Sequence, residues 1–282
     1  TKDTLLANYL TMIDIGEFVT GAAPPKLTLG KLKKIPIPLS PTGDEHEAIA
    51  DCLGSLDDLI AAEGRKLEAL RRHKQGLMQQ LFPQRGETVP RLRFSDPDDG
   101  SEWQYKVLPE IATNLNNMRI PVTEQERIPG DVPYYGASGI VDYVKDHIFD
   151  EDLLCVSEDG ANLVARTYPI AFSISGRTWV NNHAHVLRFE KSVTQILVQA
   201  YLNYIDISDY ITGMAQPKLN RAMLDSIPLA LPPTPREQND VASCIASLDH
   251  LLSMHQKKME SLSAHKKGLL QQLFPSQEEE WR

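Results

Sequence analysis

The sequence predicts a mixed α/β (α+β) protein in which a globular domain is combined with two long helices that form an antiparallel coiled coil, built as tandem duplicated half-units. Three observations lead to this prediction: a repeat with a period of 192 residues, a stretch of heptad spacing in each copy, and short apolar runs separated by Gly and Pro between them. With 282 residues, the chain is long enough for two domains with hydrophobic cores.

The internal repeat is the strongest feature of the sequence. Residues 9–83 align without a gap with residues 201–275, and 36 of the 75 aligned residues are identical. For example, GAAPPKLTLGKLKKIPIPL from Gly21 returns as GMAQPKLNRAMLDSIPLAL from Gly213. Solenoid periods are only about 20–50 residues, so this is duplication of a domain-scale unit. Only eight residues precede the first copy, whereas about 100 precede the second, so we expect the front of the first unit to be missing from this sequence.

Each copy continues into a stretch in which apolar residues recur at alternating steps of four and three. Eight of the ten positions in each series are apolar, which is typical of a coiled-coil seam. We predict helices at 44–83 and 236–275, each about 55–60 Å long and each ended by the proline of an LFP motif. The predicted seam comprises Leu53, Leu56, Ile60, Leu67, Leu70, Ile245, Leu248, Leu252, Met259 and Leu262.

The connection between the two helices predicts how they pair. A domain of about 125 residues leaves the end of the first helix and returns to the start of the second, which an antiparallel pair accommodates. Lys74 and Lys266 interrupt the two seams at equivalent positions. Two interpretations remain open: their apolar stems lie along the seam, or their charges fix register and orientation.

Between the helices, the pattern changes to short runs rich in Val, Ile, Tyr and Phe. DVPYYGASGIVDYV, DLLCVSEDGANLV and YPIAFSISGRTWVNNHAHVLRF predict strands and turns, and residues 193–206 predict a helix. Polar, cationic and aromatic side chains gather in the glycine-rich parts of this segment. Arg, Lys and Asn contact base edges and phosphates in nucleic acids, although the same residues also occur as ordinary loop polars. The candidates for contacting DNA are Tyr134, Tyr135, Ser138, Arg166, Arg177, Trp179, Asn181, Asn182, His183, Lys218 and Asn220.

Motifs for other kinds of site are missing from the sequence. SISGRTW lacks the G-x-S-x-G elbow, GASG is not a phosphate loop, and NNHAH places two histidines on one side of a strand without a third metal ligand. Cys52, Cys155 and Cys244 are too scattered for a disulfide framework or a zinc site, which favours a reducing cytoplasm. The net charge of −9 does not by itself indicate a nucleic-acid-binding protein. We therefore predict no catalytic residues and no metal.

The order of these parts resembles the specificity subunit of type I restriction–modification enzymes. WQYKVLPEIA (residues 103–112) is similar to the opening of a target recognition domain of that family, as are PYYGASGIVDYV and FSISGRTWVNNHAHVLR further along. GMAQPKLNRAMLDSIPLALPPTPREQ resembles the junction from a recognition domain into a spacer helix. The resemblance covers nearly the whole chain, and the departure that we expect from the family pattern is the lack of most of the first recognition domain.

The resemblance implies a domain plan. Residues 1–43 would be the remnant of the first target recognition domain, 44–83 the first spacer helix and 84–100 a linker; 101–235 would be the second recognition domain, 236–275 the second spacer helix and 276–282 a tail. It also implies a non-catalytic subunit that reads a bipartite sequence in double-stranded DNA, with the helix pair setting the distance between half-sites.

The implied partners are two methyltransferase (modification) subunits and restriction/translocase subunits, with no membrane. S-adenosylmethionine, ATP and Mg would belong to those partners, and this chain would bind no cofactor. Two alternatives stay open: a structural coiled-coil module with inert globular heads, and a self-dimerising half-specificity protein in which two copies read a symmetric site.

Overall fold

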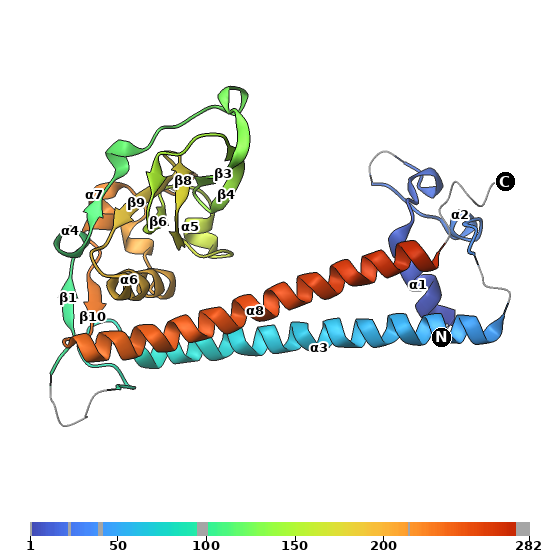
Figure 1. Ribbon diagram of the computed structural model, residues 1–282, viewed down its shortest axis with the longest axis horizontal. Coiled ribbons are helices and arrows are strands. Elements are labelled where there is room, and N and C mark those ends of the chain that lie inside the picture. Colours follow the sequence, from blue (N-terminus) through green and yellow to red (C-terminus); the bar gives the residue numbers. More distant parts are fainter. Residues whose placement is uncertain (1, 22–23, 39–41, 95–100, 214, 275–282) are drawn as a thin grey trace. The chain divides into compact units, whose positions relative to one another are not determined.

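The computed structural model describes residues 2–21, 24–38, 42–94, 101–213 and 215–274 (Figure 1). The chain divides into two compact units. The first unit comprises Thr1–Arg72 with His250–Arg282, and the second comprises His73–Asp249. Two helices of 39 residues each, α3 (Gly43–Leu81) and α8 (Pro235–Leu273), contribute to both units. The predicted tail at 276–282 and part of the predicted linker lie outside the described residues.

Helices α3 and α8 pair in opposite directions. In the first unit Asp57 meets Lys266 and Glu63 meets His255, so residue numbers rise on α3 as they fall on α8. In the second unit Lys74 meets Asp249. The predicted antiparallel arrangement is therefore confirmed, and both seam lysines form ion pairs with the opposite helix. The ten predicted seam residues lie as follows: Leu53, Leu67, Ile245 and Leu248 are buried, and Leu56, Ile60, Leu70, Leu252, Met259 and Leu262 are half-buried.

The second unit contains the globular domain, whose described residues form three small sheets. One four-stranded sheet has the order β2-β9-β6-β7 and another the order β4-β3-β8-β5, while β1 pairs only with β10. All five residues of β6 (Leu153–Ser157) are buried, as the apolar run LLCV requires. The remaining strands are β1 (Gln104–Lys106), β2 (Thr113–Asn114), β3 (Pro129–Gly136), β4 (Gly139–Val144), β5 (Phe149–Asp150), β7 (Ala171–Ile174), β8 (Arg177–Val180), β9 (Ala184–Arg188) and β10 (Leu229–Leu231).

Short helices connect these strands, and one longer helix packs beneath them. The longer helix is α6 (Ser192–Tyr204), close to the helix predicted at 193–206. The short ones are α4 (Leu108–Ile111), α5 (Asn162–Ala165) and α7 (Arg221–Asp225), with 3₁₀ turns η3 (Asn116–Met118), η4 (Glu124–Glu126) and η5 (Ser208–Tyr210). This mixture of sheets and helices confirms the predicted fold class.

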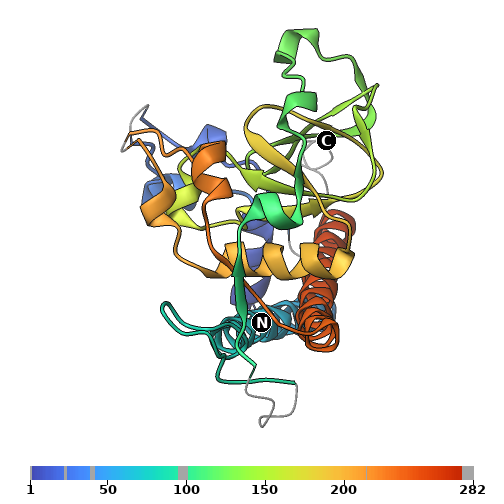
Figure 2. The same ribbon diagram turned by 90° about the vertical axis from the view of Figure 1, so that its left-hand side faces the viewer.

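Two features fix the globular domain to the helix ends of its own unit. Strands β1 and β10 run side by side in antiparallel register where the chain enters and leaves the domain (Figures 1 and 2). One hydrophobic cluster joins Phe82 after α3, Leu197 of α6 and Val241 of α8. Within it the Phe82 ring packs edge-on against Tyr201, with 5.1 Å between ring centroids. The domain is thus held by both its strands and its core.

The first unit repeats this docking on a smaller scale. It contains α1 (Lys2–Met12), η1 (Gly16–Phe18) and α2 (Leu29–Leu32) beside its portions of α3 and α8. Tyr9 of α1 packs on Phe274 with ring centroids 5.3 Å apart, and these residues are the repeat equivalents of Tyr201 and Phe82. Leu5, Leu53 and Leu270 complete the local core. The duplication seen in the sequence is therefore also a duplication of contacts.

The described residues around the repeated G-x-x-x-P-K-L segment make the same backbone contacts in both units. Thr20 and Lys26 exchange two backbone hydrogen bonds in the first unit, as Thr212 and Lys218 do in the second. The glycine that follows each threonine has positive φ, +91° at Gly21 and +80° at Gly213. These backbone contacts give the described residues of the segment a structural role before a short helix in each unit.

Candidate nucleic-acid interface

Four loops of the second unit meet at one end of its two larger sheets. Ser157, at the end of β6, donates a hydrogen bond to the Ala137 carbonyl in the β3–β4 turn. Asn181 N donates to Tyr135 O, and Glu158 N donates to His183 O. Leu219 N then donates to Glu158 O, which brings in the loop before α7. We call the side chains that these loops present the polar edge: Ser138, Glu158, Asp159, Asn182, His183 and Lys218.

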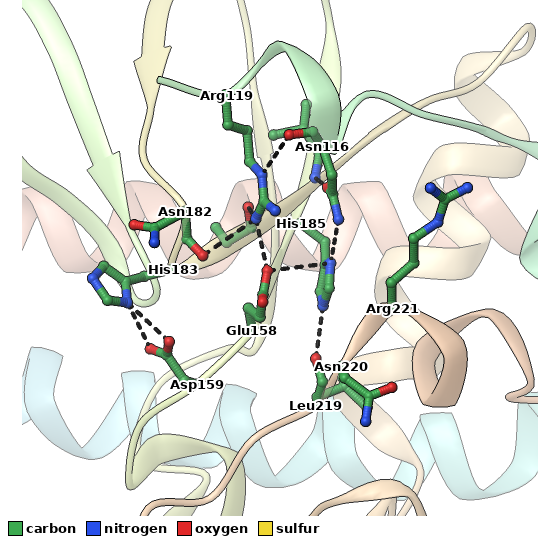
Figure 3. A network of polar contacts seen from close by, with 12 residues as sticks. Asn116, Arg119, Glu158, Asp159, Asn182, His183, His185, Leu219, Asn220 and Arg221 are labelled. Carbon is green, nitrogen blue, oxygen red and sulfur yellow. Dashed lines mark hydrogen bonds and ion pairs between the residues drawn. The ribbon is translucent and has the colours of Figure 1, made fainter. Parts of the chain in front are cut away.

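Glu158 is the centre of the polar edge (Figure 3). Arg119 Nη1 lies 2.7 Å from Glu158 Oε2 and also donates to the Ala184 carbonyl. Lys218 Nζ lies 3.3 Å from Glu158 Oε1. Burial alone would raise the pKa of Glu158, but the Arg119 hydrogen bond and the nearby positive charges hold it below its ordinary value. The carboxylate is therefore ionised, and it holds Arg119 and Lys218 in place.

His185 lies behind Glu158 and is fully buried. Its Nε2 is 2.7 Å from the Leu219 carbonyl, and its Nδ1 is 2.7 Å from Asn116 Nδ2. A neutral ring with its proton on Nε2 satisfies both contacts, because it donates to Leu219 and accepts from Asn116. Burial is the main reason that the pKa of His185 is lowered. This histidine connects two loops inside the domain.

His183 has a different environment from His185. Its ring is half-exposed and lies 2.9 Å from Asp159 Oδ2. His183 precedes β9, so the strand alternation that predicted two histidines on one side does not apply, and that prediction is wrong. Among the described residues, no group of three or more His, Cys, Asp and Glu side chains could hold a metal ion.

Several residues predicted to contact DNA are engaged inside the protein. Tyr134 is 1% exposed, its hydroxyl bonds the Val122 backbone, and the Arg127 guanidinium lies 4.4 Å above its ring. Tyr135 stacks on Phe172. These two tyrosines support the sheets, so we do not keep them in the interface.

Other predicted residues support the loops. Arg166 donates to the Leu202 and Ile205 carbonyls, and Trp179 Nε1 donates to the Ile120 carbonyl. Asn181 is 7% exposed, and its side chain accepts a hydrogen bond from His183 N. Asn220 caps α7 by accepting from Met223 N. The side chains of these four residues form hydrogen bonds within the domain that position its loops.

Five predicted residues are exposed: Ser138, Arg177, Asn182, His183 and Lys218. Four of them belong to the polar edge. Arg177 lies at the opposite end of β8 from Asn181, about 13 Å away at the usual rise of a strand. The structure therefore separates Arg177 from the others.

Sequence reasoning missed Arg119, Glu158 and Asn116, which organise the polar edge. Arg119 and Glu158 are 39 residues apart, so no local pattern links them. The only local signal is the sequence Glu158-Asp159-Gly160 directly after a buried strand, which is typical of a structured turn.

Comparison with known proteins supplies the family. The family model described as "Type I restriction modification DNA specificity domain" matches residues 2–72 and 100–264, which is most of the chain. The chain belongs to this family. Its sequence is 32% identical over 155 residues to a protein named as a type I restriction enzyme specificity subunit from Haemophilus influenzae. It is 25% identical over 268 residues to the MjaX specificity subunit of Methanocaldococcus jannaschii, also named as a type I restriction enzyme subunit.

These matches cover 55% and 86% of this chain, and 40% and 59% of the respective relatives. Solved structures of the family share the fold. The S subunit of a type I restriction–modification system from M. genitalium superposes with a TM-score of 0.70 at 17% identity, covering 97% of this chain and 72% of that one. A chain from a structure of type I system assembly gives 0.52 at 14% identity, covering 97% and 68%. No helix among the described residues is long and apolar enough to cross a membrane.

Proposed function

We propose that this chain is a non-catalytic DNA-specificity subunit, and that the globular domain of its second unit reads one half of a bipartite DNA sequence through the polar edge. The observation that carries the proposal is the match of the DNA specificity family over both repeats. The polar edge adds a physical basis, because it presents amide, imidazole, hydroxyl and ammonium groups from loops fixed by hydrogen bonds. The alternative of a coiled-coil module with inert heads has no comparable support.

The charges of the polar edge suit sequence reading better than general DNA affinity. Glu158 and Asp159 are both paired with cations or imidazole, so few positive charges remain free for phosphates. Phosphate contacts provide most non-specific affinity, whereas base contacts provide discrimination. We therefore expect weak DNA binding by the isolated chain, with net charge −9.

Partner subunits would supply the catalytic activities and additional DNA contacts of the assembly. Two modification subunits carrying S-adenosylmethionine would dock beside the helices and contribute cationic DNA contacts, and restriction subunits using ATP and Mg would join them in the cytoplasm. A self-dimer that reads a symmetric site remains a second candidate for the assembly. The M. jannaschii and H. influenzae relatives are named as subunits of type I restriction enzymes, which supports a multi-subunit assembly.

The test begins with methylome sequencing of cells with and without this gene. Loss of one bipartite methyladenine motif is expected, and an unchanged methylome would contradict the proposal. Binding of the purified complex with its modification subunit is then measured on DNA that contains or lacks the motif. Asn182→Ala should weaken binding to the motif about 10-fold more than binding to other DNA. The control, Arg85→Ala, changes an exposed cation outside the polar edge and should not alter that ratio.

A further inference from the structure

The repeat brings one position into contact with its own equivalent. His255 of α8 lies 192 residues after Glu63 of α3, the same interval that relates the two copies. Glu63 Oε2 is also 2.8 Å from His255 Nδ1. When two antiparallel helices are related by a two-fold operation, only residues at the centre of the pairing meet their equivalents. Glu63 and His255 therefore mark the centre of the α3–α8 pairing.

The ion pairs on either side of this centre are copies of each other. Asp57 with Lys266 in the first unit corresponds to Asp249 with Lys74 in the second, residue for residue. These Lys–Asp contacts would also form if two copies of the same helix paired in an antiparallel direction. Two copies of α3 would pair Asp57 with Lys74, and two copies of α8 would pair Asp249 with Lys266. The Lys–Asp pairs therefore favour one direction and one register but do not distinguish one partner helix from another.

The centre does distinguish partners, because the duplicated position carries different residues. Two copies of α3 would place Glu63 against Glu63, and two copies of α8 would place His255 against His255. Only α3 with α8 joins a carboxylate to an imidazole. The position is shielded from water, since Glu63 is 7% exposed, so two carboxylates there would repel each other. Lys258 of α8 also binds Glu63. Two imidazoles there would remove the carboxylate that Lys258 binds.

We propose that Glu63 and His255 select the pairing of α3 with α8 and disfavour the pairing of identical helices from two copies of the chain. The proposal does not depend on DNA recognition, because it concerns only the helix pair. The hydrogen bonds from Lys258 and His255 also keep the pKa of Glu63 below its ordinary value, so the carboxylate is charged at neutral pH. The central pair thus has the role of a polar residue that specifies partners in a coiled-coil seam.

The full-length chain allows a symmetric test by exchange of the two residues. Glu63→His creates the imidazole pair of two identical α8 helices, and His255→Glu creates the carboxylate pair of two identical α3 helices. The double variant restores a Glu–His pair with the roles reversed. It also restores the lysine–carboxylate contact, because Lys66 of α3 is the repeat equivalent of Lys258 and would face the carboxylate introduced at position 255. Each single variant should melt about 2–4 °C below the wild type, and the double variant should melt close to it.

The pH dependence separates pairing chemistry from simple loss of packing. The charged groups that contact position 63 from the opposite helix are His255 and Lys258. His255→Glu should be most deficient at pH 8 and recover as acid protonates one carboxylate. Glu63→His should be most deficient near pH 5, where the introduced imidazole is cationic and faces Lys258, and recover as pH rises. A double variant whose Tm loss equals the sum of the single losses, or single variants with parallel pH profiles, would overturn the proposal.

Discussion

Lys74 of α3 forms an ion pair with Asp249 of α8, and the duplicated residues Lys266 and Asp57 form the same pair in the first unit. The side chains are partly exposed, 27% at Lys74 and 43% at Asp249, so the expected contribution of the pair is about 1 kcal/mol or less. Lys74→Asp should lower the free energy of unfolding by about 1 kcal/mol by placing two carboxylates together. Adding Asp249→Lys should restore most of the loss in urea denaturation.

Lys74→Met separates the two sequence-based interpretations of the seam lysines. Met keeps an apolar stem along the seam but removes the charge. If the stem alone matters, Lys74→Met will match the wild type, whereas the ion pair predicts a loss that Asp249→Ala does not increase further. Lys266→Met in the first unit provides the matched comparison.

A backbone prediction concerns Gly213 in the repeated segment. Its φ of +80° is unfavourable for residues with a Cβ, and an added Cβ would lie 2.5 Å from the Gln216 carbonyl oxygen. Gly213→Ala should therefore destabilise the second unit by about 1–2 kcal/mol in denaturant titrations. Gly268 is the control, because it lies within α8 and an added Cβ there would meet nothing within 4 Å beyond the adjoining turns of its own helix. Gly268→Ala should stabilise by about 1 kcal/mol, and equal effects at both glycines would contradict this interpretation of the segment.

The long helices could be predicted because heptad spacing and duplication are local or periodic signals. The polar edge could not be predicted in full, because Arg119, Glu158 and His185 meet only through the tertiary fold. Tyr134 and Tyr135 show a second limit. Neighbours on a strand point to opposite faces, and the sequence does not reveal that β3 has packed clusters on both. Both tyrosines looked available for DNA, yet each packs against a different group of residues.

Removal of Glu158 tests the buried network directly. Arg119 has only 12% of its side chain exposed, so Glu158→Ala would leave a guanidinium without its carboxylate in a shielded place. Loss of one partner of a buried pair costs about 3–5 kcal/mol, and we expect the lower end because Arg119 retains backbone carbonyl partners. Urea denaturation measures the loss. The matched control, Glu151→Ala, breaks the more exposed Glu151–Arg188 pair and should cost about 1 kcal/mol or less.

The burial of His185 leads to a prediction of how the stability of the second unit responds to mild acid. Burial lowers the pKa of His185 in the folded chain from the ordinary value of 6.5, so the unfolded chain binds a proton that the folded chain does not. The free energy of unfolding should therefore fall as pH drops from about 7.5 to about 5.5. His185→Gln cannot titrate and should flatten that slope, while costing about 1–3 kcal/mol at pH 7.5 through imperfect contacts with Leu219 and Asn116. Denaturation at both pH values measures the slope, and imidazole nitrogen NMR should show that His185 takes up its proton at a lower pH than a free histidine does. Protonation of His185 at the pH of a free histidine, or an unchanged slope in His185→Gln, would show that another group controls the acid response.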